Sequence, residues 1–279
     1  MDELVREARD AWAAQDWERS ATLYEQLAVQ APDDPRVGEW WYDAALAYKF
    51  RRNWAQAYRL GVHAAAHAAR GGQDPAFWNL GIAATIQRDW VTARDAWESF
   101  GIELPPGEGP IVGNFGRACV RLVGAAGSEV VWVQRLCPTR ARVINVPFDT
   151  SRRYGEIVVH DGEPKGDRVV GDRTYRVFDE LMLFEPSDLP TLTVTVTAEP
   201  AGIEALADLF DANGFGFEPL RNGYVLCRCC SEGSVTQEAE SLGGEQRCLI
   251  AAPLDRAGEL LDAWQRSITG TWIDLHIAT

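Results

Sequence analysis

The sequence lacks long hydrophobic runs, and its first residues do not predict a targeting segment. Its apolar stretches are short and interrupted, so we expect no transmembrane helix. The first ten residues, MDELVREARD, are charged from the second residue onward and contain no apolar signal core. These two absences predict a cytoplasmic protein.

Positive charge is also scarce. The chain has 27 Lys and Arg against 41 Asp and Glu, for a net charge of −14. A negative surface repels nucleic acid and anionic lipid, so we expect neither nucleic acid nor a membrane as a partner. It suits a basic protein partner. Solubility alone also explains an acidic composition, and this alternative stays open.

Catalytic signatures are missing as well. The sequence contains no P-loop, zincin, nucleophile elbow or kinase motif, and nothing places a nucleophile beside a base. Gly107-x-Gly109-x-x-x-Gly113 is similar to a nucleotide loop, but it contains Pro110 and follows a predicted helix instead of a strand. We therefore expect a non-enzymatic protein without a cofactor.

Cysteine is sparse, and its pattern gives only a weak metal signal. The six are Cys119, Cys137, Cys227, Cys229, Cys230 and Cys248, which we interpret as free thiols. Cys227 and Cys230 have C-x-x-C spacing, and Cys248 is a third candidate zinc ligand. On a strand, however, Cys227 and Cys230 would point to opposite faces, which favours structural thiols.

Two histidines four residues apart, His63 and His67, would share one face of a helix. A zinc site needs a third protein ligand and usually an acidic neighbour, whereas the surrounding segment is rich in alanine. We interpret both as packed or solvent-facing histidines.

What the sequence does contain is a tandem repeat. A dipeptide ending in tryptophan recurs at spacings of 37 and 36 residues, as Asp16-Trp17, Asn53-Trp54 and Asp89-Trp90. A fixed period in this range predicts stacked helical units, each of which needs its neighbour to bury its apolar face. Such arrays present extended binding surfaces, so the repeat favours partner binding.

Residues 75–105 closely resemble a tetratricopeptide repeat. Gly81 lets two helices approach, Trp97 fills the core between them, and Pro105 stops the second helix. The other matching residues are Leu80 and Ala93 in the third unit, Trp41, Tyr48, Ala57 and Ala64 in the second, and Tyr24 and Pro32 in the first. The second unit has Ala45 in place of the glycine. The likeness covers residues 1–105.

The resemblance implies a right-handed stack of antiparallel helix pairs whose first helices line a concave groove. The matching groove positions are Arg9, Trp12, Tyr42, Leu46, Lys49, Trp78, Ile82 and Thr85. Aromatic and Arg side chains are common interface anchors. The alternative is that Trp12 or Trp78 packs against the following helix.

The remainder of the chain predicts two further domains. Residues 111–187 alternate as short strands, which indicates a small β-barrel or curled sheet, with His160 and Asp161 at a turn. Residues 190–279 follow the order β-α-β-β-α-β, similar to a ferredoxin-like sandwich with an added hairpin at 221–223. The predicted fold is therefore a multidomain α + β protein, divided at 1–105, 111–187 and 190–279.

Together these features predict a protein-binding protein. Its acidic charge and its repeats beside an α+β part are loosely similar to the tetratricopeptide-containing immunity proteins of bacterial polymorphic toxin systems. That resemblance implies a cytoplasmic immunity protein that binds and neutralises a toxin, with a basic toxin domain as the partner. The alternatives are a general scaffold or adaptor that holds a peptide in the groove, and a cysteine-based zinc-binding protein.

Overall fold

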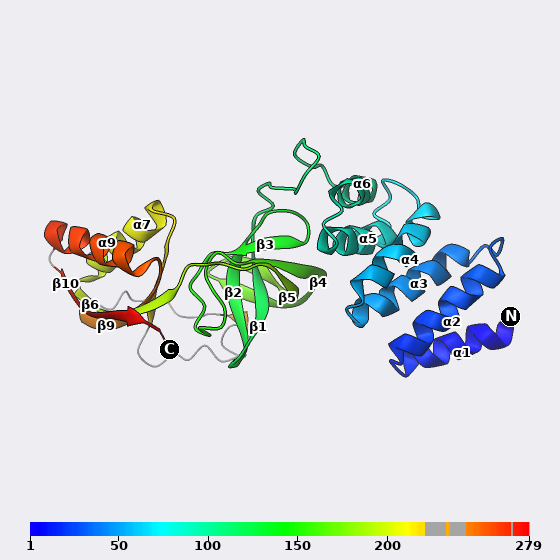
Figure 1. Ribbon diagram of the computed structural model, residues 1–279, viewed down its shortest axis with the longest axis horizontal. Helices are drawn as coiled ribbons and strands as arrows, with labels where there is room; N and C mark the ends of the chain where they lie inside the picture. The colour runs from blue at the N-terminus through cyan, green and yellow to red at the C-terminus, as the bar shows by residue number, and fades with distance from the viewer. Residues whose placement is uncertain (221–232, 235–243, 269, 279) are drawn as a thin grey trace. The chain divides into compact units, whose positions relative to one another are not determined.

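The computed structural model describes residues 1–220, 233–234, 244–268 and 270–278. The chain divides into two compact units, each considered by itself (Figure 1). The first comprises residues 1–113 and 137–139, and the second comprises 114–136 and 140–279. None of the helices in the described ranges combines the length and apolar composition that crossing a membrane requires.

The first unit is helical. Its helices are α1 (Asp2–Ala13), α2 (Trp17–Gln30), α3 (Val37–Phe50), α4 (Trp54–Ala66), α5 (Pro75–Ile86) and α6 (Trp90–Phe100). Each helix packs against the next along the chain, which gives three pairs in sequence (Figure 1). The sequence period is therefore reproduced as a period of helix pairs.

The turn within each pair has the same geometry. Asp16, Asn53 and Asp89 each cap the second helix by accepting a hydrogen bond from the backbone N–H three residues later, at 3.2, 3.3 and 3.1 Å. The non-glycine residue before each cap has a left-handed φ of 57°, 55° and 60° respectively. Because this conformation costs an L-residue about 1–2 kcal/mol, its recurrence shows that the cap and the helix packing require it.

The second unit contains two sheets. The first is built from β1 (Arg117–Gly124), β2 (Gly127–Arg135), β3 (Arg140–Val143), β4 (Ile157–Val170) and β5 (Arg173–Glu185). Successive strands pair antiparallel, and β1 pairs parallel with β5, which closes the ring. β8 (Gly233–Ser234) adds to β4. Buried valines and Phe178 fill the interior, as expected for a small barrel.

A buried ion network holds the loop before β4 to the barrel. Arg152 donates to both carboxylate oxygens of Glu180, at 2.6 and 2.8 Å, and to Glu156 at 2.9 Å. It also donates to the carbonyl oxygen of Val123 at 3.0 Å. All three charged side chains are buried, and this pairing helps to compensate for the hydration that they lose, together with a hydrogen bond from Val123 N–H to Glu180 at 3.0 Å.

His160 corrects one sequence expectation. It lies within β4 and not at a turn tip, because β4 continues past it to Val170 through several register shifts. Its ring is fully buried beside Phe178, at 4.8 Å between ring centroids. Burial lowers the pKa of His160 to about 4, so the imidazole is neutral at physiological pH.

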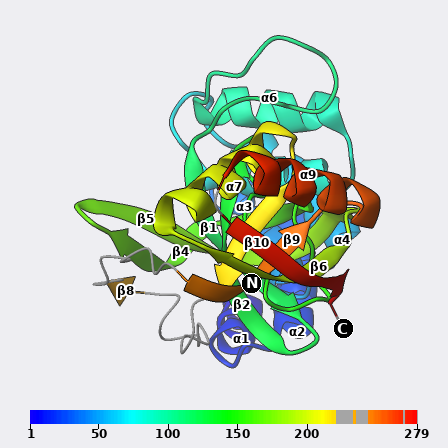
Figure 2. The same ribbon diagram turned by 90° about the vertical axis from the view of Figure 1, so that its left-hand side faces the viewer.

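The second sheet has the strand order β10-β6-β9-β7, with every pair antiparallel. Its elements are β6 (Thr191–Ala198), α7 (Pro200–Ala212), β7 (Gly216–Leu220), β9 (Gly244–Ala251), α9 (Leu254–Ser267) and β10 (Gly270–Ile277). Helices α7 and α9 cover one face (Figure 2), where Phe210 and Trp264 join the apolar core. The hairpin predicted at 221–223 lies outside the described residues.

Candidate protein-binding surface

The predicted groove positions lie on the first helix of each pair, on α1, α3 and α5. Ile82 and Thr85 are fully buried, and a buried side chain presents no surface to a partner. The physical reason is that α5 is enclosed on nearly every side, with buried residues from Leu80 through Thr85, as in a core helix. The positions that keep exposed surface are Arg9, Trp12, Tyr42, Leu46, Lys49 and Trp78.

The two groove tryptophans also pack against the second helix of their own pair. Trp12 meets Trp17 edge-on, with 5.2 Å between ring centroids. Trp78 meets Trp97 in the same way at 5.1 Å. Both indoles are only partly exposed, so each contributes packing as well as an exposed edge.

Helices α3 and α5 are joined by a polar chain that the sequence pattern did not predict. The ammonium group of Lys49 donates to the amide oxygen of Asn79 at 3.0 Å. The amide nitrogen of Asn79 donates to the hydroxyl of Tyr42 at 3.4 Å. Burial raises the pKa of Tyr42, so the phenol stays protonated. The signal for Asn79 was its polarity within the otherwise apolar segment PAFWNLGIAATI.

A cleft of about 500 Å³ lies beside Tyr42, between α3, the end of α4 and the start of α5. We call it the acidic cleft, because Glu39, Asp43 and Asp74 contribute carboxylates to its lining together with His67. The sequence pattern could have indicated two of these residues, since Glu39 and Asp43 are four apart and share one helix face. Asp74 is brought to them only by the stacking of the pairs.

The carboxylate of Asp43 is the perturbed group in the acidic cleft. Burial and the neighbouring Glu39 raise the pKa of Asp43 to about 6, while Arg9 on α1 opposes the shift. Asp74 also has a structural role. It caps α5 by accepting a hydrogen bond from Ala76 N–H at 2.9 Å.

One glycine shapes the wall of the cleft. A Cβ at Gly38 would lie 2.8 Å from Cβ of His67, so only glycine lets the start of α3 approach the end of α4 this closely. The cleft is thus a consequence of helix packing and not of a flexible loop.

The candidate metal ligands gain no support in the described part of the chain, where no group of three or more His, Cys, Asp and Glu could hold an ion. Cys227 and Cys230 lie outside the described residues. Cys248 is buried among the core of the second sheet, and burial raises its pKa to about 12, which keeps the thiol protonated. His63 stacks on a tryptophan of α3 at 4.7 Å, and His67 follows the end of α4.

No protein-family model matches this chain, and no curated protein matches it. Among solved structures, a hypothetical protein from Neisseria gonorrhoeae aligns with 58% of this chain and 95% of its own, at 11% identity and a TM-score of 0.24. A likeness of this size establishes neither a shared fold nor a function.

Proposed function

We propose that this chain is a non-enzymatic protein that binds a protein partner through its helical unit. The observation that carries the proposal is the surface of α3 and α5, where Tyr42, Lys49 and Trp78 keep exposed surface and Tyr42 also lines the acidic cleft. Aromatic anchors beside a concave, polar-lined site are typical of recognition surfaces.

We assign the helical unit to the tetratricopeptide class and the second sheet to the ferredoxin-like class. The first assignment is supported by Gly81, where a Cβ would lie 2.6 Å from the indole of Trp97. The recurring caps support it as well. The second is supported by the order β6-α7-β7-β9-α9-β10 around an antiparallel sheet.

The specific form of the proposal is a cytoplasmic immunity protein that neutralises a bacterial toxin. A chain with a net charge of −14 attracts a basic toxin domain from a distance and can occlude its active site. Such an inhibitor acts by covering a surface, so it needs no cofactor and no catalytic residue of its own.

Co-expression with the product of the neighbouring gene tests this form directly. We expect a stable complex, rescue of growth when that product is toxic, and an association rate that falls with added salt. Failure to form any complex, together with no protection, would remove the immunity proposal.

A general peptide-binding adaptor is the second candidate. The Lys49–Asn79–Tyr42 chain favours it, because it places an ammonium, an amide and a hydroxyl along one surface at which a peptide backbone could hydrogen-bond. Replacing Tyr42, Lys49 and Trp78 with alanine should then abolish peptide capture while circular dichroism stays unchanged. Loss of toxin binding with intact peptide binding would argue for the immunity form instead.

A further inference from the structure

We propose that the acidic cleft receives a cationic side chain, Lys or Arg, from an extended segment of the protein partner. This inference rests on the proposed function, because it names the chemistry of the partner at the same surface. The cleft is suited to such a guest because its lining gathers three carboxylates, two from α3 and one from the turn before α5.

The lining of the cleft carries charge of one sign. Glu39 and Asp43 come from α3, and Asp74 comes from the turn before α5. Among the described residues that line it there is no Lys or Arg, and His67 is the one other titratable group besides Tyr42. A volume of about 500 Å³ accommodates a long side chain with the adjoining backbone of a peptide.

The three carboxylates are unequally satisfied within the protein. Asp74 accepts the capping hydrogen bond of α5. Asp43 is half-buried on α3, and the charges that act on it are Glu39, which disfavours its ionised form, and Arg9, whose opposing effect is smaller. No hydrogen bond within the described residues offsets the desolvation of Asp43. A cation in the cleft would supply the missing charge and donors.

Neighbouring features favour a protein segment over a free ion. Tyr42 lines the cleft and also ends the hydrogen-bond chain through Asn79 to Lys49. The cleft is therefore continuous with the surface that the proposed function assigns to a partner. A segment that enters the cleft with a basic side chain would continue along α3 and α5.

A labelled hexa-arginine peptide, titrated into the whole chain and followed by fluorescence anisotropy, tests the inference. The cleft variant combines Glu39→Gln, Asp43→Asn and Asp74→Asn; asparagine caps helices as well as aspartate does, so α5 keeps its cap. We expect affinity to fall by about tenfold or more, which corresponds to about 1.4 kcal/mol.

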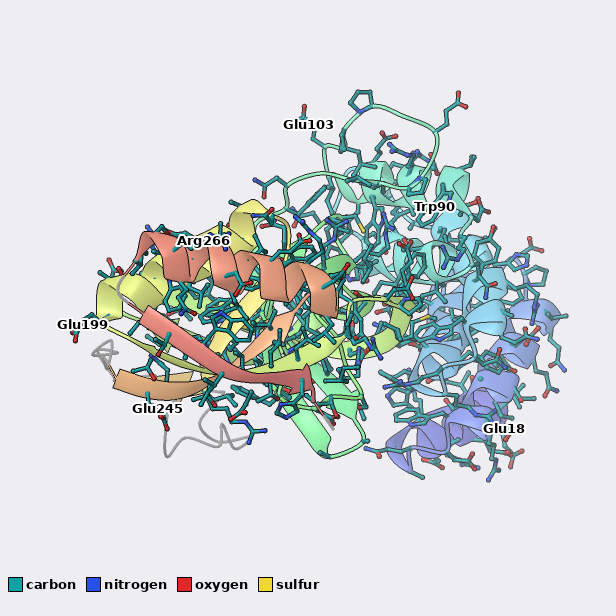
Figure 3. The ribbon with its side chains drawn as sticks, turned by 60° about the vertical axis from the view of Figure 1, so that its left-hand side comes forward. Glu18, Trp90, Glu103, Glu199, Glu245 and Arg266 are labelled. Carbon is teal, nitrogen blue, oxygen red and sulfur yellow. The ribbon has the colours of Figure 1, made fainter. Side chains whose placement is uncertain are left out.

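The matched control removes the same charge elsewhere, through Glu98→Gln, Glu103→Gln and Glu108→Gln. All three residues are exposed, and Glu103 extends from the loop after α6 (Figure 3). An equal loss of affinity in both variants would overturn the inference, because it would show that general electrostatic attraction explains the binding. If the cleft variant fails to fold by circular dichroism, Asp43→Asn alone is compared with Glu103→Gln.

Two further readouts separate a cleft site from a weak surface effect. Bound peptide should lower the pKa of Asp43, measured from its carboxyl chemical shift, and Arg9→Ala should tighten binding because it removes a competing cation. An unchanged pKa, or displacement of the peptide by millimolar Ca²⁺ but not by free arginine amide, would also overturn the proposal.

The peptide assay separates this inference from the proposed function. A natural partner that binds the cleft variant as tightly as the unmodified chain would remove the inference and leave the proposed function intact. Specific peptide binding in the cleft with no protein partner from the neighbouring gene would count against the immunity form alone.

Discussion

The second and third helix pairs have the same backbone arrangement, but their large side chains occupy different positions. In the third pair, Gly81 lies directly against the indole of Trp97. The positions 36 residues earlier are Ala45 and Gly61, so the second pair has two small residues where the third has a glycine and a tryptophan. Gly61 instead faces Leu80 of the next pair, where an added Cβ would lie 3.5 Å from Cδ1 of the leucine. The repeat thus preserves the helix arrangement, while the side chains that fill it differ from unit to unit.

The two pairs differ at their caps as well. Asp89 accepts a hydrogen bond from the Tyr58 hydroxyl at 2.6 Å, in addition to the one from Thr92 N–H. Asn53 caps α4 through Gln56 N–H at 3.3 Å. The cap of the third pair therefore also ties α6 to α4, and the third pair should be the more sensitive to substitution.

The largest expected effect on stability is at Trp97, in the third pair. Trp97→Ala should lower the free energy of unfolding by about 3–5 kcal/mol, because it empties a fully buried site. Gly61→Ala at the equivalent position should cause no loss and stabilise by up to about 1 kcal/mol, since its Cβ makes only ordinary contacts with Leu80 and alanine favours helices. Urea denaturation followed by the far-ultraviolet circular dichroism of the helices measures both. Similar losses in the two variants would mean that the pairs are packed alike.

The glycine beside that tryptophan gives the next largest effect. Gly81→Ala should destabilise by about 1–3 kcal/mol through overpacking, although alanine favours helices. The reverse change in the second pair, Ala45→Gly, should cost about 1 kcal/mol through helix propensity alone. A Gly81→Ala variant as stable as the unmodified chain would take away the main support for the tetratricopeptide assignment.

The two N-terminal caps, Asp89 of α6 and Asn53 of α4, should differ less in their contribution to the free energy of unfolding. Asp89→Ala should cost about 1–2 kcal/mol and Asn53→Ala about 1 kcal/mol, both measured in the same urea titrations. The additional loss at Asp89 should disappear in a Tyr58→Phe background, where the second hydrogen bond is already missing. Additive effects of the two substitutions would show that the link between α6 and α4 adds no stability.

The sequence was most informative where structure depends on local residues. The starts of α2, α4 and α6 were predictable because a cap and its helix lie within a few residues of each other. Gly81 and Trp97 were predictable partners because the repeat brings together residues from adjacent helices. Each inference needed only one helix pair.

Features that need distant segments were not predictable in the same way. The burial of Ile82 and Thr85 depends on what surrounds α5, which the period of one helix does not specify. The acidic cleft needs Asp74 to stack beside α3. Ring closure in the barrel pairs Cys119 with Val177, and no local pattern encodes such a register.

The smallest effect concerns charge, at equivalent positions that carry Asp43 in the second pair and Asn79 in the third. The pKa of Asp43 is raised to about 6 in the folded protein, above the ordinary value of about 4 for an unfolded chain. The folded state therefore binds this proton more tightly, so the ionised carboxylate destabilises the fold above pH 6, and this penalty disappears as the pH falls toward 4.

Asp43→Asn should consequently raise the melting temperature slightly at about pH 7.5 and leave it unchanged at about pH 4, relative to the unmodified chain at each pH. Asp10→Asn removes the same charge from an exposed position on α1 and serves as the control for net charge. An equal gain from both substitutions at the higher pH would assign the effect to overall charge. A gain confined to Asp43→Asn would show that the second pair retains an energetically unfavourable carboxylate where the third has a neutral amide, as expected for a residue kept for binding a cation.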